Sequence, residues 1–596
     1  MNHNQTPFAY HGSYLEIDAS LGTSRSVPLE AEFLRSCLGG SGLGTAVLLQ
    51  KEAAAIDPLE PDAPICFAFS PLVGSPLTTS AKFAVVCKSP LTNRINDSLA
   101  SSQFAITGKK TGFDALVIVG QAQELSVLVI DDGQIEFVPV PHLRRVGIGA
   151  TNHWLKTHFA ADYCFAVIGP AGERLVRFAT ISHDGRHAGR GGAGAVLGSK
   201  NIKAIAVRGT KRVAWADPPR LNQLAKDLSA KSFGPATQKY RELGTVSNLL
   251  TFNRLNALPT RNFQSGSFEL SHELSPSDAN VALHKTRASC AACTIGCEHI
   301  FSKDPQKPGV RLEYESLFAL GSLCGIGSID AVMNLTRTCD EFGIDSISAG
   351  GTIACAMECA ERGLIDAPWL RFGSESAATR CLDAMNRRDD DLGNMLAKGS
   401  RQFAREVGGA AADFANHVKG LELPGYEPRA LQTMALGLAV GCRGADHNRS
   451  GAYEADFSAQ VDRKNPGIQA ARFAVETENR AAIMDSLILC KFVRGVFQSF
   501  YDECAQMMQA ATGWSIDAFE LQELAFRIVD MKKEFNVRAG WTPAEDWLPP
   551  RFFFEPLDDR DGTKIMGSRL QFQIEEYNRC RGWNIMGFPQ NMENGQ

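Results

Sequence analysis

Four cysteines place the strongest constraint on how this chain can fold. Cys290, Cys293 and Cys297 fall within eight positions, and Cys490 follows almost two hundred residues later. A tight loop can wrap three thiolates around one corner of an inorganic cube while a distant element supplies the fourth, as in [4Fe-4S] proteins. A four-cysteine zinc site is the nearest alternative, although structural zinc sites usually pair two cysteine knuckles. The spacing therefore predicts a redox protein whose fold brings positions 290 and 490 together.

The remaining composition excludes several classes of protein. With 21% charged residues, 44% hydrophobic residues and a net charge of −5, the chain has no basic excess for binding nucleic acid or an anionic membrane. Its longest apolar stretches, such as 434–440, are too short to cross a bilayer. The first seven residues show no secretion leader, and sixteen cysteines without one indicate a reducing cytoplasm. The grouping of four cysteines could also be a coincidence among the sixteen. We expect most of the other twelve cysteines to be buried as small apolar side chains.

The pattern of apolar residues changes near position 212. Before it, short β-branched runs separated by Gly, Pro and Asp predict strands at 83–87, 115–119, 126–130, 164–168 and 203–207. After it, helical periodicity covers 315–324, 331–342, 347–363, 470–482 and 518–535. We therefore expect an α+β multidomain protein: a mostly antiparallel or mixed sheet domain at 1–212 and mainly helical domains at 213–420 and 421–596. The last boundary falls at prolines and glycines in 419–428.

Two glycine-rich stretches interrupt the strand-rich part. Residues 39–44 lack dinucleotide-binding spacing, whereas 189–194 match G-x-G-x-x-G. A Rossmann turn needs a strand directly before the glycines, and the polar residues 183–188 predict a loop there instead, which disfavours NAD or FAD. A loop with Arg186, Arg190 and free backbone amides suits a phosphate ester, and a close-packed turn is the alternative.

Several further motifs coincide with the cysteine spacing. They are Glu313-Tyr-Glu315, Arg443-Gly-Ala-Asp-His447 and the stretches 188–200, 340–345, 421–429, 535–538 and 548–552. With them, the chain resembles the aldehyde:ferredoxin oxidoreductase family over nearly its whole length. Members carry tungsten, sometimes molybdenum, in a bis-pyranopterin beside a [4Fe-4S] cluster. The resemblance implies a β-sheet base for this cofactor, with two helical domains closing over it.

The resemblance also implies which residues bind the pterins. Segments 340–345 and 485–490 would do so, with Asp340, Asp345 and Asp485 accepting hydrogen bonds from pterin N–H groups; ordinary helix caps are the alternative. Cys490 would ligate the cluster and touch a pterin. A Mg²⁺ ion bridging the pterin phosphates would use the Leu99 carbonyl. The other expected cofactor contacts are Lys82, Arg186, Ala188, Gly189, Arg190, Gly191, Gly192, Ile344, Arg443, Gly444, Arg449 and Leu489. A surface arginine pair around a turn is the alternative for Arg443 and Arg449.

Three positions depart from the family pattern. Lys82 replaces an arginine and so keeps the charge but not the bidentate fork. Residues 99–102 replace Asn-Ser-Gly-Gly, and Ile488 replaces a glycine in the second pterin segment.

The catalytic residues implied by the resemblance are Glu315 and His447, with Glu313 as the alternative carboxylate. A carboxylate and an imidazole near the metal can activate water and collect protons. We expect an enzyme that interconverts aldehydes and carboxylic acids and exchanges electrons with a ferredoxin or an iron-sulfur subunit, as a homo- or hetero-oligomer. The alternatives are a benzoyl-CoA-reductase-like subunit reducing an aryl acyl-thioester, a non-catalytic cluster-bearing subunit whose pterin site has decayed, and a flavin or NAD enzyme.

Overall fold

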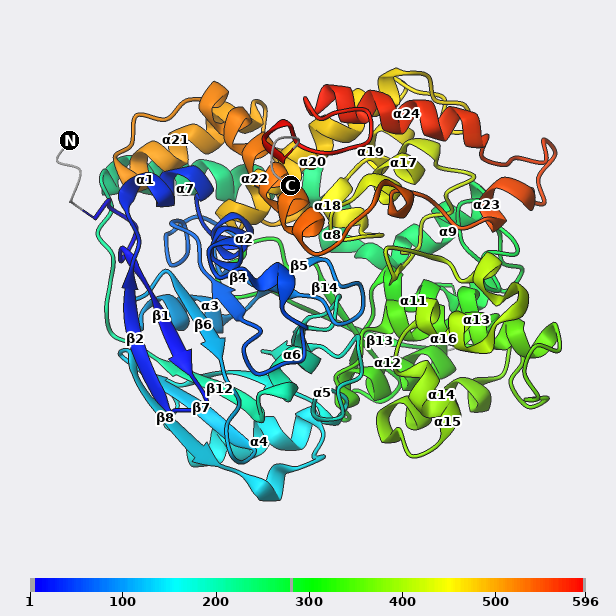
Figure 1. Cartoon of the computed structure of the whole chain (residues 1–596), viewed down its shortest axis with the longest axis horizontal. Coiled ribbons are helices and arrows are strands. Elements are labelled where there is room, and N and C mark those ends of the chain that lie inside the picture. Colours follow the sequence, from blue (N-terminus) through cyan, green and yellow to red (C-terminus); the bar gives the residue numbers. More distant parts are fainter. Residues whose placement is uncertain (1–5, 279–281, 593–596) are drawn as a thin grey trace.

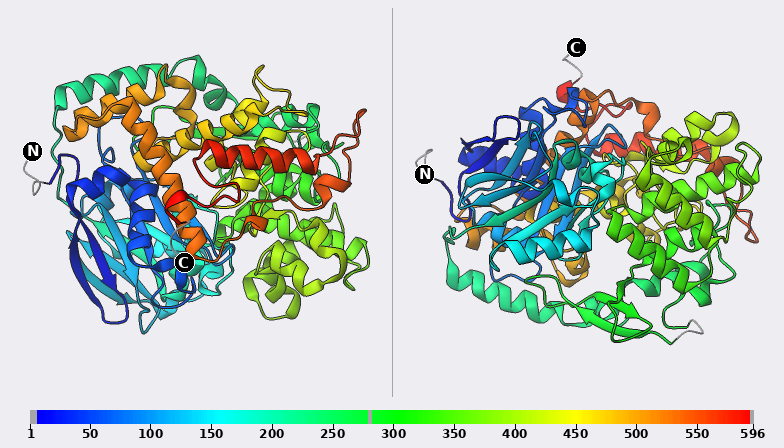
Figure 2. Two further views of the ribbon diagram at one scale, coloured as in Figure 1. Left: turned by 45° about the horizontal axis from the view of Figure 1, so that its top comes forward. Right: turned by 90° about the horizontal axis from the view of Figure 1, so that it is seen from below.

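The computed structural model describes residues 6–278 and 282–592, with a strand-rich part followed along the chain by helices (Figure 1). The first five residues, which belong to the amino-terminal stretch discussed above, lie outside this range. Figure 2 shows the strands (blue to cyan) on one side and the helices of the middle of the chain (green) on the other. The predicted α+β class is confirmed.

Two six-stranded mixed sheets form the strand-rich part. In each, one neighbouring pair is parallel, β1 with β6 and β12 with β7, and the other pairs are antiparallel. In spatial order, the strands of the first sheet are β2 (Thr23–Pro28), β1 (Ser13–Asp18), β6 (Ala115–Val119), β3 (Ile65–Ala68), β4 (Lys82–Lys88) and β5 (Ile95–Ser101). Those of the second sheet are β11 (Arg186–Ala188), β10 (Ile181–His183), β9 (Cys164–Ile168), β12 (Ile202–Arg208), β7 (Ser126–Asp131) and β8 (Gln134–Pro139). All five predicted strands are present, and buried side chains from both sheets share one core, including Phe83, Ile118 and Ile205.

The five predicted helical segments are also present. They are α11 (Tyr314–Leu320) with a following 3-10 turn (Ser322–Cys324), α12 (Ile329–Phe342), α13 (Ser346–Glu361), α20 (Gln469–Leu487) and α22 (Ala518–Arg538). The prediction of one helix over 315–324 was wrong at Gly321, where the backbone leaves the helical region (φ −104°, ψ −98°). Among the described residues, no single helix is long and apolar enough to cross a membrane, and Tyr314–Cys324 with Ile329–Phe342 pass that test only together, bent by 115°.

The other α-helices include short ones around the sheets and longer ones in the second half of the chain. They are α1 (Ala31–Cys37), α2 (Gly40–Gln50), α3 (Gln103–Lys109), α4 (Ile148–His158), α5 (Pro170–Glu173), α6 (Ala193–Ser199), α7 (Pro218–Ser232), α8 (Pro235–Glu242), α9 (Asn248–Arg254), α10 (Ser271–Leu274), α14 (Glu375–Arg387), α15 (Asp391–Leu396), α16 (Ser400–Val407), α17 (Gln432–Val440), α18 (His447–Ser450), α19 (Tyr453–Asp456), α21 (Phe500–Thr512), α23 (Arg551–Phe554) and α24 (Gly567–Cys580). Two small sheets complete the fold. One contains β13 (His284–Ala288), β14 (Glu298–Ser302) and β15 (Val310–Arg311), and the other contains β16 (His417–Val418) and β17 (Leu421–Glu422).

Helix α2 connects the first sheet to the carboxy-terminal helices. It packs against β4 on one side and against α20 and α22 on the other. A methyl group on Gly44 would lie 2.4 Å from Val86 of β4, so the close approach of helix and sheet requires glycine. The glycine-rich stretch 39–44 is therefore explained by packing.

The second glycine stretch follows a hairpin. Residues 181–188 form β10 and β11, so the prediction of a polar loop over 183–188 was wrong. Strand β11 lies at the edge of its sheet and pairs only with antiparallel β10, so no parallel βαβ unit surrounds the glycines as a Rossmann site requires. Gly191 (φ +85°) and Gly192 (φ +82°) are left-handed, and added methyl groups would lie 2.0 Å from Asn96 and 2.1 Å from the Arg177 carbonyl. Gly189 has no atom within 4 Å of that position.

This difference within one loop predicts unequal effects of substitution on stability. Gly192→Ala adds left-handed strain and a clash with backbone, and is expected to lower the free energy of unfolding by about 2–4 kcal/mol. Gly189→Ala is the matched control and is expected to change it by less than about 1 kcal/mol. Chemical denaturation of both variants measures this, and equal losses would show that the loop is not close-packed.

Candidate functional site

A cavity of about 680 Å³ lies where the sheets meet the helices. Strands β4, β5 and β11 contribute to its wall, with α9, α11, α12, α18 and the segment after α20. The predicted site residues that line it are Lys82, Leu99, Arg186, Gly189, Arg190, Cys290, Cys297, Glu313, Glu315, Asp340, Ile344, Asp345, Arg443, His447, Arg449, Asp485, Leu489 and Cys490. Ala188, Gly191, Gly192, Cys293 and Gly444 are not in this lining. Residues far apart in sequence thus border one space.

The three clustered cysteines occupy the loop between β13 and β14, and Cys490 follows the end of α20. Cys290, Cys297 and Cys490 line the cavity. Burial, followed by the nearby Cys490 and Cys290, raises the pKa of Cys293 to about 11. Across the described ranges, no three or more His, Cys, Asp or Glu side chains are arranged to hold a single metal ion. Cysteine thiolates are ligands for iron-sulfur clusters and for zinc alike, so the donor set is compatible with the predicted cluster.

The three aspartates of the two expected pterin segments differ in their contacts. Asp345 caps α13 by accepting hydrogen bonds from the backbone N–H groups of residues 347 and 348, and it lies 3.4 Å from Arg190. Asp345 therefore caps a helix and also lines the cavity. Asp340 and Asp485 instead lie in the last turns of α12 and α20. Asp340 borders the cavity with 52% of its side chain exposed, and partial desolvation by the cavity wall raises its pKa.

The backbone is alike in the two segments despite the unusual residue in the second. Gly343 ends α12 in the left-handed conformation (φ 70°, ψ 52°), and Ile488 ends α20 in nearly the same one (φ 63°, ψ 43°). This conformation is costly for a β-branched residue. Ile488 is fully buried, and a methyl group on Gly40 of α2 would lie 2.7 Å from its Cδ1. The substitution changes the packed side chain and keeps the turn.

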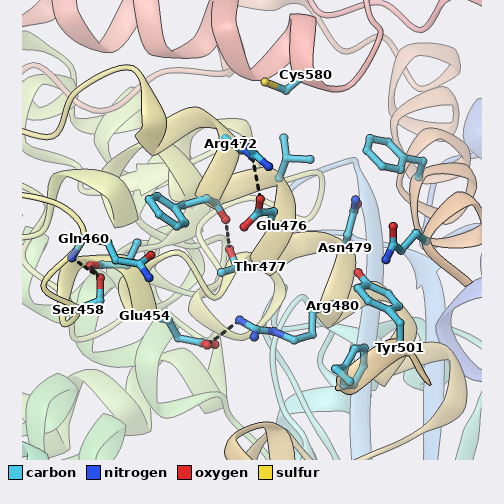
Figure 3. A pocket seen from close by; sticks show the side chains of 16 residues that line it. Glu454, Ser458, Gln460, Arg472, Glu476, Thr477, Asn479, Arg480, Tyr501 and Cys580 are labelled. Atoms are coloured by element: carbon cyan, nitrogen blue, oxygen red, sulfur yellow. Dashed lines mark hydrogen bonds and ion pairs between the residues drawn. The ribbon is translucent and has the colours of Figure 1, made fainter. Parts of the chain in front are cut away.

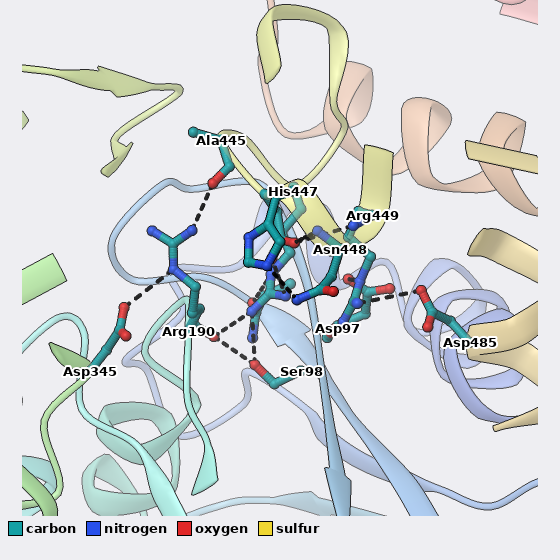
Figure 4. A network of polar contacts seen from close by, with 12 residues as sticks. Asp97, Ser98, Arg190, Asp345, Ala445, His447, Asn448, Arg449 and Asp485 are labelled. Carbon is teal, nitrogen blue, oxygen red and sulfur yellow. Dashed lines mark hydrogen bonds and ion pairs between the residues drawn. The ribbon is translucent and has the colours of Figure 1, made fainter. Parts of the chain in front are cut away.

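Buried arginines connect the sheet edge to the helices (Figure 4). Arg443 donates to Asn96 Oδ1 at 3.0 Å, to Asp446 Oδ2 at 2.7 Å and to the Arg190 carbonyl at 2.8 Å. Arg449 donates to Asp97 Oδ1 at 3.0 Å. The surface-pair interpretation of Arg443 and Arg449 is therefore wrong.

Two aspartates of this network, Asp97 and Asp446, were not predicted as site residues. Asp97 also accepts a hydrogen bond from Lys532 at 2.8 Å and from Ser41 at 2.5 Å. Asp446, which caps α18, lies inside the motif that contains Arg443 and His447, so its position in the sequence could have identified it as a site residue. For Asp97 the available signal was a run of polar residues within a strand pattern.

Three groups were expected near the cofactor phosphates: the side chains of Lys82 and Arg186 and the backbone carbonyl of Leu99. Lys82 and Leu99 lie on one wall of the cavity, and Arg186 lies on another. Lys82 and Leu99 are on adjacent strands, with Leu99 opposite Ala84 in the register. Arg186 pairs with Glu298 at 2.9 Å. Burial lowers its pKa, but the nearby Cys290, Glu313, Glu298 and Cys297 together raise it above the usual value. Arg186 therefore belongs to the cysteine side of the cavity.

Glu315 and His447 face each other within the cavity. Glu315 Oε1 and His447 Nε2 are 3.7 Å apart, which is too long for a hydrogen bond. Glu315 Oε2 accepts one from the Gly425 N–H at 3.1 Å, and the His447 ring stacks on Tyr426 at 4.9 Å. In the described chain, Glu315 Oε1 and His447 Nδ1 are buried without a hydrogen-bond partner. Two such atoms beside open space fit a site that receives a polar ligand.

Burial shifts the two pKa values in opposite directions. It raises the pKa of Glu315 to about 8 and lowers that of His447 to about 4, because both charged forms lose hydration. At neutral pH the pair is therefore a mostly protonated acid beside a neutral imidazole. Glu313 is exposed and precedes α11 without making a side-chain cap bond.

A second cavity, of about 690 Å³, lies among α19, α20, α21, α22 and α24 (Figure 3). Its charged side chains are paired, Arg480 with Glu454 at 2.7 Å and Arg472 with Glu476 at 3.0 Å. None of the predicted site residues lines it. We therefore assign the functional site to the first cavity.

Comparisons with known proteins agree with the resemblance. The models for the amino-terminal domain and for domains 2 and 3 of aldehyde ferredoxin oxidoreductase match residues 14–209 and 223–593. The chain is 34% identical to the tungsten-containing aldehyde ferredoxin oxidoreductase of Thermococcus kodakarensis and 32% identical to that of Pyrococcus furiosus, with 97% of this chain and 96% of each relative covered.

More distant relatives share the architecture. The WOR-like subunit of the aliphatic sulfonate oxidoreductase of Pyrococcus furiosus is 26% identical over 98% of this chain and 96% of its own. A solved structure of the active-site complex of benzoyl coenzyme A reductase with 1,5-dienoyl-CoA superposes with a TM-score of 0.84 at 22% identity, covering 99% and 97% of the two chains. The full-length matches and the fold together show that the chain belongs to the aldehyde ferredoxin oxidoreductase family.

Proposed function

We propose that this enzyme interconverts aldehydes and carboxylic acids and passes the electrons to a ferredoxin-type carrier. The reaction is R–CHO + H₂O → R–COOH + 2 e⁻ + 2 H⁺. The observation that supports it best is the Glu315–His447 pair, which borders the same cavity as the cysteines. The relatives' names, which include tungsten, aldehyde and ferredoxin, support the same reaction.

The cofactors follow from the family and from the groups present. Four thiols fit a [4Fe-4S] cluster, and Asp340, Asp345 and Asp485 would hold the two pterins of a tungsten or molybdenum cofactor. The Leu99 carbonyl would bind Mg²⁺ between the pterin phosphates. When bound, the tungsten or molybdenum cofactor would supply two-electron redox chemistry, and the cluster would supply one-electron transfer. A boundary between domains at 212 would leave the sheet domain as the base of this cofactor, under helical domains at 213–420 and 421–596.

Glu315 and His447 handle the protons. In the oxidising direction the ionised Glu315 accepts a proton from water, and neutral His447 accepts or orients a second one. In the reducing direction the protonated Glu315 donates. The raised pKa of Glu315 places both forms within reach of neutral pH. Glu315 Oε1 and His447 Nδ1 have no hydrogen-bond partner in the described chain, whereas His447 Nε2 lies 3.0 Å from Asn448 Nδ2. We therefore assign Glu315 Oε1 and His447 Nδ1 to the reactant.

The wall next to this pair favours an apolar substrate body. Tyr426 stacks on His447, Phe252 meets Tyr426 at 5.2 Å, and Phe457, which is 43% exposed, stacks on Phe252 at 5.4 Å. All three line the cavity. Three cations that line the cavity near this wall have partners. Lys491 lies 2.8 Å from Asp485, Arg494 lies 3.2 Å from Glu454, and Lys239 donates to Asn248 Oδ1 at 2.6 Å. Aromatic aldehydes therefore fit better than phosphorylated ones.

Exchange of Glu315 tests its assigned role against that of Glu313. Glu315→Gln removes the buried acid–base group and is expected to lower kcat/KM for aldehyde oxidation about 10²–10⁴-fold. Glu313→Gln removes an exposed carboxylate on the same wall and is expected to keep most of the activity. Dye-linked assays, at matched metal content, measure both. The reverse ranking would assign catalysis to Glu313.

The pH dependence should differ between the two directions. Ionised Glu315 is the active form for oxidation, so kcat/KM is expected to rise with pH and level off above about 8, the pKa that burial produces. Acid reduction needs the protonated form and is expected to fall over the same range. In Glu315→Gln both profiles should lose this transition, and an unchanged transition would assign it to another group.

Metal analysis and a substrate panel separate the proposed enzyme from its alternatives. Anaerobic preparations are expected to contain about four iron atoms and one tungsten or molybdenum per chain, the composition of one cube and one bis-pterin. Aromatic aldehydes with a viologen dye should outperform phosphorylated aldehydes. Iron alone would indicate a cluster-bearing subunit. Activity only with an aryl-CoA and a strong reductant would indicate a thioester reductase.

A further inference from the structure

A loop of the sheet domain, residues 75–80 between β3 and β4, touches both cysteine segments. The Thr79 backbone N–H donates to the Ala292 carbonyl at 2.6 Å, inside the Cys290–Cys297 loop. The Thr79 hydroxyl oxygen accepts a hydrogen bond from the Cys490 N–H at 3.3 Å. One residue thus bridges the two segments that supply the four sulfurs.

Neighbouring contacts strengthen the bridge on each side. Thr78 Oγ1 accepts a hydrogen bond from the Thr294 N–H at 3.0 Å and lies 3.0 Å from the Thr294 hydroxyl. Ser70 donates to the Leu487 carbonyl at 2.6 Å, and Ser486 accepts from the Gly42 N–H at 3.2 Å. Among the described residues, no hydrogen bond joins 289–297 directly to 485–492. The sheet domain therefore supplies a hydrogen-bonded link between the two cysteine segments, in addition to the stacking of Tyr240 of α8 on Phe492 at 4.2 Å.

Three strained backbone positions lie at or beside these contacts. Thr79 (φ 67°), Ala292 (φ 49°) and Ile488 (φ 63°) are left-handed residues other than glycine. Two of them are β-branched, for which this conformation is a genuine outlier. Such strain persists only where the surroundings over-determine the backbone. At position 79 glycine would relieve the strain, whereas threonine supplies the oxygen that accepts from Cys490.

We propose that Thr79 is a positioning residue that holds the Cys490 segment at the correct separation from the Cys290–Cys297 loop for all four thiolates to bind one cluster. The inference rests on the proposed function only in assuming that the four cysteines carry a cluster. Without the Thr79 hydroxyl, the Cys490 N–H loses its acceptor and the fourth thiolate is no longer tied to the loop that carries the other three.

The test compares three substitutions in the full-length, anaerobically purified enzyme. Thr79→Val keeps the shape and the β-branch and removes the acceptor, Thr79→Ser keeps the acceptor, and Thr79→Gly removes the acceptor while relieving the strain. Thr92→Val is the matched control, because the buried Thr92 hydroxyl likewise accepts a backbone N–H, that of Arg94, away from the cysteines. Iron release to a chelator, the paramagnetic resonance signal of the reduced cluster and thermal unfolding are measured for each.

Thr79→Val and Thr79→Gly are expected to release iron about 10–100-fold faster than the wild type and to change the resonance signal, as loss of an outer-shell partner does at metal sites. Thr79→Ser and Thr92→Val should behave like the wild type. Thr79→Gly should match or exceed the thermal stability of Thr79→Val, which separates strain from the hydrogen bond. Wild-type iron retention and spectrum in Thr79→Gly would overturn the proposal. A wild-type enzyme without iron would instead refute the cluster itself.

Discussion

The buried carboxylate of Asp97 is the contact on which the assembled cavity depends. Arg449 and Lys532 approach its two oxygens, and these cations keep its pKa below the usual range although burial acts in the opposite direction. The three residues come from β5, α18 and α22. Removing one partner of a buried ion pair leaves an uncompensated charge, so the sheet edge cannot separate from these helices at low cost. The ion pairs of Asp97 with Arg449 and Lys532 therefore hold the walls of the cavity together.

Burial also determines the chemistry of the site. Glu315 and His447 lie close together without a hydrogen bond, and burial moves their pKa values towards the uncharged forms. An exposed pair would instead ionise and attract, which would occupy the groups with each other. Burial therefore leaves an acid and a base available to a substrate, a condition that suits proton transfer coupled to oxidation.

Local patterns anticipated the elements and much of the site. The β-branched runs and helical periods became strands and helices because their apolar faces are buried as the spacing required. Gly321, which ends a predicted helix early, and the hairpin over 181–188 were missed, since tertiary contacts decide short segments. Asp97 was missed because strand polarity alone does not reveal a buried ion pair.

By itself, the sequence determined the fold class, the four cysteines and the family, because these depend on residue spacing along the chain. Only the tertiary structure decided how the cysteine segments are linked, since the Thr79 loop and the packing of Ile488 on Gly40 come from distant segments. It also decided that Glu315, and not Glu313, is the buried carboxylate. Burial and contact are properties of the assembled domains, and spacing in a single segment carries no record of them.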